Sequence, residues 1–337
     1  MELIKFICGQ FCVIPAMAAV VILLTDCKKK FSEEHQGVTV NVKTLGAVGD
    51  GTTDDTWAFN KAIDQVAADG GTVYVPVGTY LINPDVSIIM KSNVILDMVD
   101  SMRIIQVKPS SLLRYNVIRM HKISNAQVNG GKIIGERYQH IGTEGEWGAG
   151  ITLYEATNCK VIRTVITDCW GDGIVVGSQS SLYNAPNASV NCVISGVQSR
   201  NNRRQGLTIG GVDSLIIDSC KFTYTNGTAP QAGIDIEPDK NTAERVYIKN
   251  CEIAYNAKVG IEMNAKSGTP AIIRKVTVEG NYIHHNTYSA YIQNVSYVKM
   301  YYNILTFNDW NGPAAGGNGN VPYTVNATYS VFTPNTY

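Results

Sequence analysis

Hydrophobic and polar positions follow one five-residue pattern that recurs through the second half of the chain. Each copy has a small residue second, a hydrophobic residue third, a mostly polar fourth position and, except in the last copy, a hydrophobic residue fifth. The copies lie at residues 149–153, 172–176, 205–209, 232–236, 259–263 and 289–293. Such alternation predicts a strand with one buried side. The small residues lie 23 to 33 residues apart, which suits one solenoid coil for each copy.

Alignment of the copies also predicts which side chains share a row. Ile234 and Ile261 are expected to face the core, and in the last copy Tyr291 and Gln293 take the same positions. A second strand in each coil is predicted at residues 216–220, 247–251, 277–281 and 299–303. We expect two stacks of side chains beside it, one of Cys220, Cys251, Asn281 and Asn303, and one in the following turn of Asn226, Asn256, Asn286 and Asn308.

The earlier part of the chain carries a motif at residues 41–63, NVKTLGAVGDGTTDDTWAFNKAI, followed by a glycine-rich and β-branched segment at residues 70–80. This region resembles the opening signature of the pectate lyase superfamily. The resemblance implies an all-β right-handed parallel β-helix with a short N-terminal capping helix. We expect one such domain at residues 41–310, followed by a C-terminal tail at residues 311–337.

The residues of the motif are consistent with a capping helix. Thr53, Asp54 or Asp55 can cap its N-terminus. The face expected to be buried holds Trp57, Ala58, Ala62, Ile63 and Val66.

The first 27 residues form a separate unit. Lys5 precedes an apolar run at residues 6–24, and Cys27 is followed by three lysines. This pattern is typical of an export signal, and its end resembles the lipobox of bacterial lipoproteins, in which the cysteine carries the lipid. We therefore predict lipidation at Cys27, a linker at residues 28–40, and an exported, membrane-anchored protein in the cell envelope or at the surface. An uncleaved anchor and ordinary secretion are the alternatives.

Composition and charge narrow the possible partners. Hydrophobic residues make up 45% of the chain and charged residues 17%, and 28 basic residues balance 28 acidic ones. Without a basic surplus, nucleic acid is not an expected partner. After residue 27 the cysteines are Cys159, Cys169, Cys192, Cys220 and Cys251, with no spacing typical of a metal site or a disulfide framework. We expect them in the core.

Carboxylates gather on the outward side of the repeated strands. The register makes Asp235, Glu237 and Glu262 neighbours, and it places Asp172 at the edge of the same face. Residues two apart on a strand lie about 6.5–7 Å apart, within the range of about 6.5–9.5 Å that separates the acid and base of an inverting glycosidase. Mutual repulsion of close carboxylates raises at least one pKa, as a general acid requires. We predict that these four residues are catalytic.

Substrate-binding residues are predicted beside the carboxylates. Arg204 and Lys258 can hold an acidic group of a sugar, and Gln205 lies on the same edge. A polar insertion at residues 135–148 is expected to form a groove wall. Trp147 in this insertion and Tyr154 in the strand after it can stack on sugar rings. His140 and Glu146 in this insertion are weaker catalytic candidates.

Together these features predict a glycoside hydrolase that acts on polysaccharide as a monomer. Residues 171–173, Gly-Asp-Gly, partly resemble the acidic motif of polygalacturonases, whose Gly-His-Gly and Arg-Ile-Lys motifs are absent here. Residues 235–239 are similar to the acidic strand of mannuronan epimerases, without the histidine that follows it there. A polysaccharide lyase or epimerase acting on uronates is therefore one alternative, and a non-catalytic glycan-binding surface protein is another. We expect no cofactor, although a lyase can require calcium.

Overall fold

The computed structural model describes residues 37–178, 188–267, 269, 271–308, 321–333 and 335–337. The predicted export signal, Cys27 and most of the predicted linker lie outside these residues. Residues Val38–Tyr337 form one compact unit. Among the described residues, no helix is both long and apolar enough to cross a membrane.

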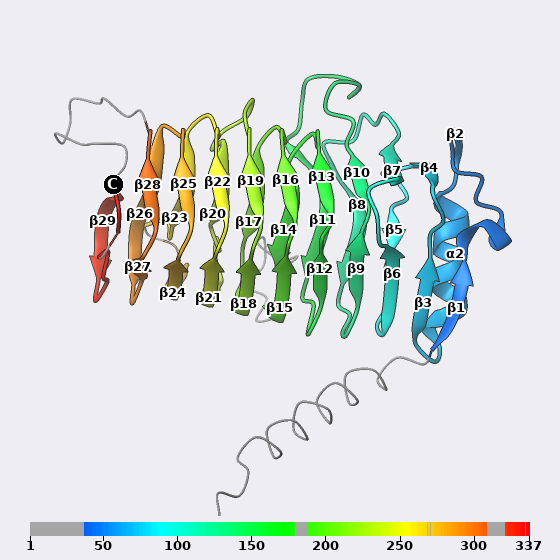
Figure 1. Ribbon diagram of the computed structural model, residues 1–337, viewed down its shortest axis with the longest axis horizontal. Coiled ribbons are helices and arrows are strands. Elements are labelled where there is room, and N and C mark those ends of the chain that lie inside the picture. Colours follow the sequence, from blue (N-terminus) through cyan, green and yellow to red (C-terminus); the bar gives the residue numbers. More distant parts are fainter. Residues whose placement is uncertain (1–36, 179–187, 268, 270, 309–320, 334) are drawn as a thin grey trace, which may run out of the picture. The chain divides into compact units, whose positions relative to one another are not determined.

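This unit is an all-β parallel β-helix of about nine turns with very little helix, as the sequence predicted (Figure 1). Each turn contributes strands to three faces. The first, which we call the groove face, consists of β5 (Ile88–Ile89), β8 (Arg114–His121), β11 (Trp147–Tyr154), β14 (Ile174–Gly177), β17 (Gln205–Ile209), β20 (Ala232–Ile236), β23 (Val259–Asn264), β26 (Tyr288–Ser296) and β29 (Tyr323–Thr328).

The other two faces complete each coil. The second face consists of β1 (Val38–Asn41), β3 (Gly71–Tyr74), β6 (Val94–Met98), β9 (Gln127–Gly130), β12 (Lys160–Ile162), β15 (Ser189–Ser195), β18 (Val212–Asp218), β21 (Thr242–Lys249), β24 (Ile272–Glu279) and β27 (Lys299–Tyr301). The third face consists of β2 (Asp50–Asp54), β4 (Gly78–Ile82), β7 (Arg103–Val107), β10 (Lys132–Ile134), β13 (Val165–Thr167), β16 (Gln198–Arg200), β19 (Lys221–Thr223), β22 (Glu252–Ala254), β25 (Tyr282–His284) and β28 (Ile304–Thr306).

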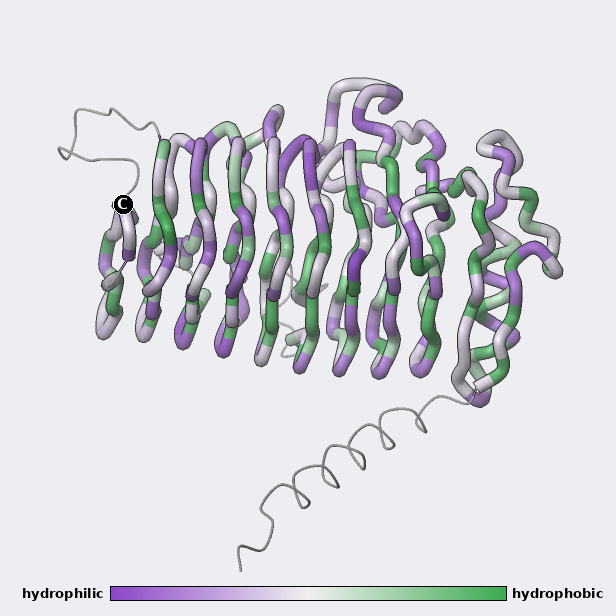
Figure 2. The backbone as a smooth tube through the Cα atoms, in the orientation of Figure 1, coloured by the Kyte–Doolittle hydropathy of each residue, from purple (hydrophilic) through white to green (hydrophobic). Residues whose placement is uncertain are grey.

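The core lies between the three faces, and the alternation in the sequence explains it. Hydrophobic and hydrophilic residues alternate along the coils (Figure 2). Ile234 pairs with Leu207 and Ile261 in neighbouring strands, and all three side chains are fully buried. The predicted register of these coils is therefore confirmed. The five described cysteines are also buried and free.

A helix, α2 (Thr56–Ala67), and a short 3₁₀ helix, η1 (Val42–Leu45), lie at the N-terminal end of the β-helix. The Asp54 side chain accepts hydrogen bonds from the Thr56 backbone N–H and hydroxyl, at 3.1 and 2.6 Å. The prediction for Trp57 was wrong, because its side chain is 65% exposed. Phe59 takes the buried position instead and packs edge-on against Tyr80.

Side-chain ladders connect the coils along the turns. The predicted stack is present, since Cys251 N–H donates to Asn281 Oδ1 at 2.9 Å and Asn281 N–H donates to Asn303 Oδ1 at 3.0 Å. In the second stack Asn256 receives a hydrogen bond from the Thr225 N–H at 3.1 Å. Thr225 therefore takes the place predicted for Asn226, whose carbonyl and side-chain oxygens both bind Arg137 at 2.7 Å.

Two predictions near the C-terminus were wrong. Glu262 pairs with Tyr291 and Met263 with Ile292, so the last copy is shifted by one residue from the predicted alignment. Because strands have a period of two, this shift buries Ala290 and Ile292 and turns Tyr291 and Gln293 outward. The predicted tail at residues 311–337 also contains β29, which pairs with β26 and extends the β-helix.

Candidate functional site

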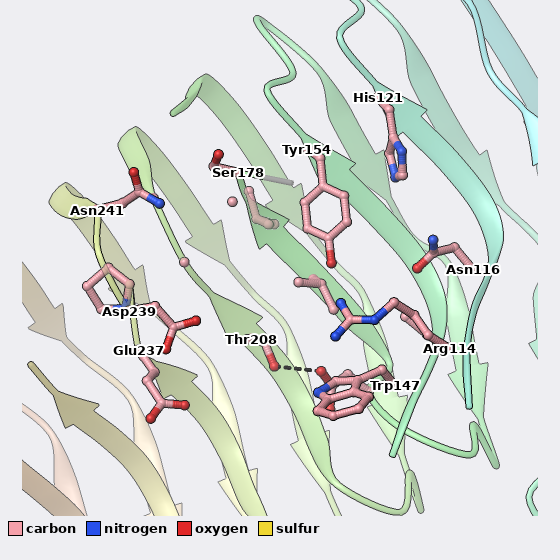
Figure 3. Close-up of a pocket in the computed structure, with 18 of the residues that line it drawn as sticks. Arg114, Asn116, His121, Trp147, Tyr154, Ser178, Thr208, Glu237, Asp239 and Asn241 are labelled. Carbon is pink, nitrogen blue, oxygen red and sulfur yellow. Dashed lines mark hydrogen bonds between the residues drawn. The ribbon is translucent and has the colours of Figure 1, made fainter. Parts of the chain in front are cut away.

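A groove of about 570 Å³ runs across the groove face. Strands β8, β11, β14 and β17 form its floor, and residues after β20 and β23 form one rim. Figure 3 shows Arg114, Trp147, Tyr154 and Glu237 around this groove. Outward side chains of parallel neighbours lie side by side on such a floor, which brings together residues far apart in the sequence.

A buried ion pair occupies the groove floor. Arg204 Nη1 lies 2.8 Å from Asp172 Oδ2, and the Thr208 hydroxyl lies 2.9 Å from the same oxygen. Burial raises the pKa of Asp172, while Arg204 and Thr208 act in the opposite direction. The two predicted residues Asp172 and Arg204 therefore both line the groove, but they are paired with each other.

Tyr154 projects into the groove (Figure 3), which Asp172 and Arg204 also line. Burial, followed by the negative charge of Asp172, raises the pKa of its hydroxyl to about 12, and Arg114 and Arg204 act against this rise. The phenol is consequently neutral at physiological pH. A neutral phenol beside cations can donate a proton to a developing negative charge.

His121, at the end of β8, lies beside Tyr154 with 4.7 Å between ring centroids. Burial and the nearby charge of Arg119 lower its pKa to about 4, so the imidazole is neutral at physiological pH. Its Nε2 lies 2.6 Å from the Thr152 hydroxyl, and Nδ1 has no hydrogen-bond partner among the described residues. A neutral imidazole of this kind can accept a proton.

Trp147 lies at the other end of the floor and is 39% exposed. The Arg114 guanidinium lies 4.5 Å from the centre of its ring. Among the described residues, neither Arg114 nor Arg119 has a carboxylate within salt-bridge distance. The groove therefore presents two cations that are available to an anionic ligand.

The predicted carboxylate cluster has a different environment from the one expected. Asp235 points away from Ile234 and Ile236, but it is only 1% exposed, and it is absent from the groove lining. The buried side chain of Gln205 donates a hydrogen bond to it. Burial, followed by repulsion from Glu262 and Glu237, raises the pKa of Asp235 well above its usual range. The expectation that Asp235 is in contact with water was wrong, because neighbouring outward side chains cover it.

The remaining predicted residues divide between the groove and its surroundings. Glu237 lines the groove and pairs with Lys266 at 2.6 Å. Glu262 is half-buried, and burial followed by repulsion from Glu237 raises its pKa. Neither Glu262 nor Lys258 is among the residues that line the groove. The structure thus brings Asp172, Arg204, Trp147, Tyr154 and Glu237 together at one groove and leaves the other candidates outside it.

The predicted wall insertion is built around a buried cluster. His140 stacks on Trp170 with 3.9 Å between ring centroids, and its Nδ1 lies 2.8 Å from Glu136 Oε1. Tyr115 donates a hydrogen bond to the same carboxylate. The His140 side chain is only 1% exposed, so it holds the wall together and does not line the groove.

Sequence reasoning missed the contribution of β8. Arg114, Asn116, Arg119 and His121 from this strand all line the groove. The strand precedes the first clear copy of the repeat, and for that reason it was not aligned. Its sequence, RYNVIRMH, nevertheless alternates between polar and apolar residues over the first four positions, which is a signal for an outward polar row.

No group of three or more histidine, cysteine, aspartate or glutamate residues suited to holding a metal ion is found in the described part of the chain.

Comparison with known proteins places the chain in a family. Residues 39–314 match the family described as rhamnogalacturonase A/epimerase, pectate lyase-like. The chain belongs to this family. The predicted membership of the pectate lyase superfamily is thereby confirmed.

The chain is also similar to individual proteins and solved structures. An uncharacterized protein of Bacillus subtilis, YclG, is 32% identical over 220 residues, which are 59% of this chain and 38% of YclG. The A-module of the Azotobacter vinelandii mannuronan C-5 epimerase AlgE4 superposes with a TM-score of 0.61 at 17% identity, covering 89% of each chain. Gene product 12 of bacteriophage phi29 has a TM-score of 0.61 at 21% identity, covering 88% of this chain and 41% of that one. These structural similarities establish the fold alone.

Proposed function

We propose that the protein acts on an acidic polysaccharide and removes the C5 proton of a uronate residue bound in the groove, as a lyase or an epimerase does. The observation that carries this proposal is the juxtaposition of Tyr154 and His121, both neutral, with Arg114 and Arg119 on one groove floor. The similarity to a mannuronan epimerase module is consistent with it.

The chemistry follows from the charges. A proton next to a carboxylate is hard to remove because negative charge accumulates on that carboxylate. Cations placed at the carboxylate stabilise this charge, and Arg114 and Arg119 have no carboxylate partner within the described residues. The predicted hydrolase pair of Asp235 and Glu237 is less favourable, because Asp235 does not line the groove.

The two neutral side chains supply the proton transfers. We assign His121 as the base that takes the C5 proton, leaving the electron pair delocalised onto the uronate carboxylate. Tyr154 is the acid. If it protonates the departing O4, the glycosidic bond breaks and an unsaturated sugar forms. If water on the open side of the groove returns a proton to the opposite face of C5, the sugar is epimerised and the chain stays intact, because Tyr154 and His121 lie on the same side of the sugar. Each transfer contributes about 100- to 10,000-fold in rate.

One observation supports glycoside hydrolysis as a second candidate function. Asp172 and Glu237 are carboxylates that line the same groove, and burial raises the pKa of Asp172. A general acid needs such a raised pKa. In this mechanism Asp172 replaces Asp235 as the acid and Glu237 activates the water.

A single incubation distinguishes these candidates. The full chain is mixed with alginate, polygalacturonate or a neutral glucan in D₂O, with calcium or with a chelator. Either of two products supports the proposal. Near-ultraviolet absorbance of an unsaturated sugar, which has no hydrogen at C5, identifies a lyase. Deuterium at C5 of an intact chain identifies an epimerase. New reducing ends without unsaturation or deuterium indicate hydrolysis. Binding without any of these products would show a glycan-binding protein and would refute the enzymatic proposal.

Matched variants test the assigned acid. Tyr154→Phe removes one hydroxyl and is expected to reduce the rate at least about 100-fold. The control Tyr329→Phe changes a tyrosine that is 78% exposed and outside the groove lining. Equal rates for the two variants would exclude Tyr154 as the acid.

A further inference from the structure

A second polar hollow, of about 470 Å³, lies on the third face and is here called the third-face pocket. Strands β10, β13 and β16 and the residues that follow β19 contribute to it, from four successive coils (Figure 1). None of its lining residues lines the groove. Its chemistry is carried by Lys132, Thr167, Asp168, Gln198, Arg200 and Tyr224.

The pocket has two cations with no carboxylate partner. Among the described residues, neither Lys132 nor Arg200 has an acidic group within salt-bridge distance. Asp168 is the only carboxylate in the lining, and its oxygens accept hydrogen bonds from Thr167 at 2.6 Å and from Asn201 at 2.5 Å. An anionic group near Lys132 and Arg200 would therefore meet unneutralised positive charge.

An aromatic ring forms another wall. Tyr224 is 45% exposed, and Tyr255 covers one side of it in a parallel stack with 4.9 Å between centroids. Tyr224 borders the pocket, and the Arg200 guanidinium lies 5.8 Å from its ring centre. Because Tyr255 and Arg200 lie over its two faces, Tyr224 presents its edge and hydroxyl to the pocket. This hydroxyl, the amide of Gln198 and the oxygens of Asp168 suit the hydroxyl groups of a sugar.

The pocket is also held in shape before any ligand binds. Arg137 donates to the carbonyl oxygens of Asn201 at 2.8 Å and of Asn226 at 2.7 Å, both of which are lining residues. Asn201 in turn donates to the Tyr138 hydroxyl at 2.9 Å. Fixed side chains lower the entropy lost on binding.

We propose that the third-face pocket is a second glycan-binding site that takes an acidic sugar residue. The acid group binds Lys132 and Arg200, and the sugar hydroxyl groups bind Gln198, Asp168 and the Tyr224 hydroxyl. This site does not depend on the reaction in the groove. Because it lies on another face, it holds a polysaccharide to the protein and raises the local concentration of chain at the groove.

Calorimetric titration of the full chain tests the proposal. Octasaccharides of galacturonate and of mannuronate are the probes, maltooctaose is the neutral control, and the Tyr154→Phe background limits turnover. We expect two oligosaccharides per protein. Arg200→Gln is expected to reduce this to one, or to weaken the second site about tenfold, which is ~1.4 kcal/mol. Lys299→Gln removes a positive charge on the second face and is expected to retain both sites.

The outcomes separate this site from the groove. The Tyr154→Phe protein could bind a single oligosaccharide and lose this binding when Arg200→Gln is added. That result supports the third-face pocket and contradicts uronate binding in the groove. If Arg200→Gln changes neither the stoichiometry nor the affinity, the proposal for the third-face pocket is refuted, and the proposal for the groove is unaffected. Absence of binding overturns both, and equal binding of maltooctaose overturns the requirement for an acidic sugar.

Discussion

Replacing Asp235 with asparagine is expected to stabilise the protein at neutral pH. The carboxylate is 1% exposed, and its Oδ1 has no hydrogen-bond partner among the described residues. Burial, with repulsion from Glu262 and Glu237, raises its pKa well above the ordinary 3.8. The folded protein therefore keeps this proton at pH values where the unfolded chain has released it.

The sign and size of the effect follow from linkage between protonation and folding. Below pH 3.8 both states hold the proton, so Asp235 adds no pH dependence. Between pH 3.8 and the raised pKa, only the unfolded state releases it. The free energy of unfolding then falls by about 1.4 kcal/mol for each pH unit as pH rises. Asparagine cannot ionise, so this contribution disappears from the slope in Asp235→Asn.

Urea unfolding followed by circular dichroism between pH 4 and 8 measures this slope. Asp64→Asn is the control, because that carboxylate is 61% exposed and paired with Lys91 on the surface. We expect Asp64→Asn to follow the wild-type slope and Asp235→Asn to show a shallower one, with its advantage greatest at high pH. Parallel curves for Asp235→Asn and the wild type would show that Asp235 is hydrated and ionised in the folded state.

Three further predictions concern the core, a ladder and the N-terminus. Ile261→Ala should reduce the free energy of unfolding by about 2–5 kcal/mol in a urea titration. Ile216→Ala, at a side chain that is 39% exposed, should reduce it by less than about 1 kcal/mol. Equal reductions would contradict the assigned strand register. Asn256→Ala should lower the free energy of unfolding by about 3 kcal/mol, because it leaves the buried Thr225 N–H unpaired. Asn226→Ala, in the turn, should lower it clearly less when both are measured by thermal unfolding. The reverse order would contradict the ladder. We propose that Cys27 carries a lipid, so Cys27→Ser should move the protein from the membrane to the soluble fraction, and retention in the membrane would instead support an uncleaved anchor.

Much of the fold was predictable because each coil repeats the same alternation. Ile234 and Ile261 are buried as the aligned pattern required. The alignment failed at Tyr291, where the small residue of the pattern was assigned to Ala290 although Ser289 pairs at that level. The sequence contains two small residues there, and only the pairing of whole strands decides between them.

The candidate site was less predictable for a different reason. Alternation gives the direction of a side chain but does not reveal what covers it. Asp235 does point outward, yet Gln205 from the preceding coil lies against it and both are buried. Conversely, His121 and Arg114 lie on a strand that precedes the clear repeat, so their place beside Tyr154 follows only from the pairing of β8 with β11. Contacts between coils thus determine the site.

The two ladders on either side of the third-face strands have a consequence for how this protein can diversify. The two ladder positions lie five positions apart in each of four coils, from Cys220 to Thr225, Cys251 to Asn256, Asn281 to Asn286 and Asn303 to Asn308. The connections that follow the groove-face strands differ widely in length, since residues 178–188 join β14 to β15 and only two residues join β17 to β18. Within this chain, the connections beside the groove therefore vary in length, whereas the spacing between the two ladders is constant. A change of loop length on the groove side would leave the ladders, and with them the stacking of the coils, in place.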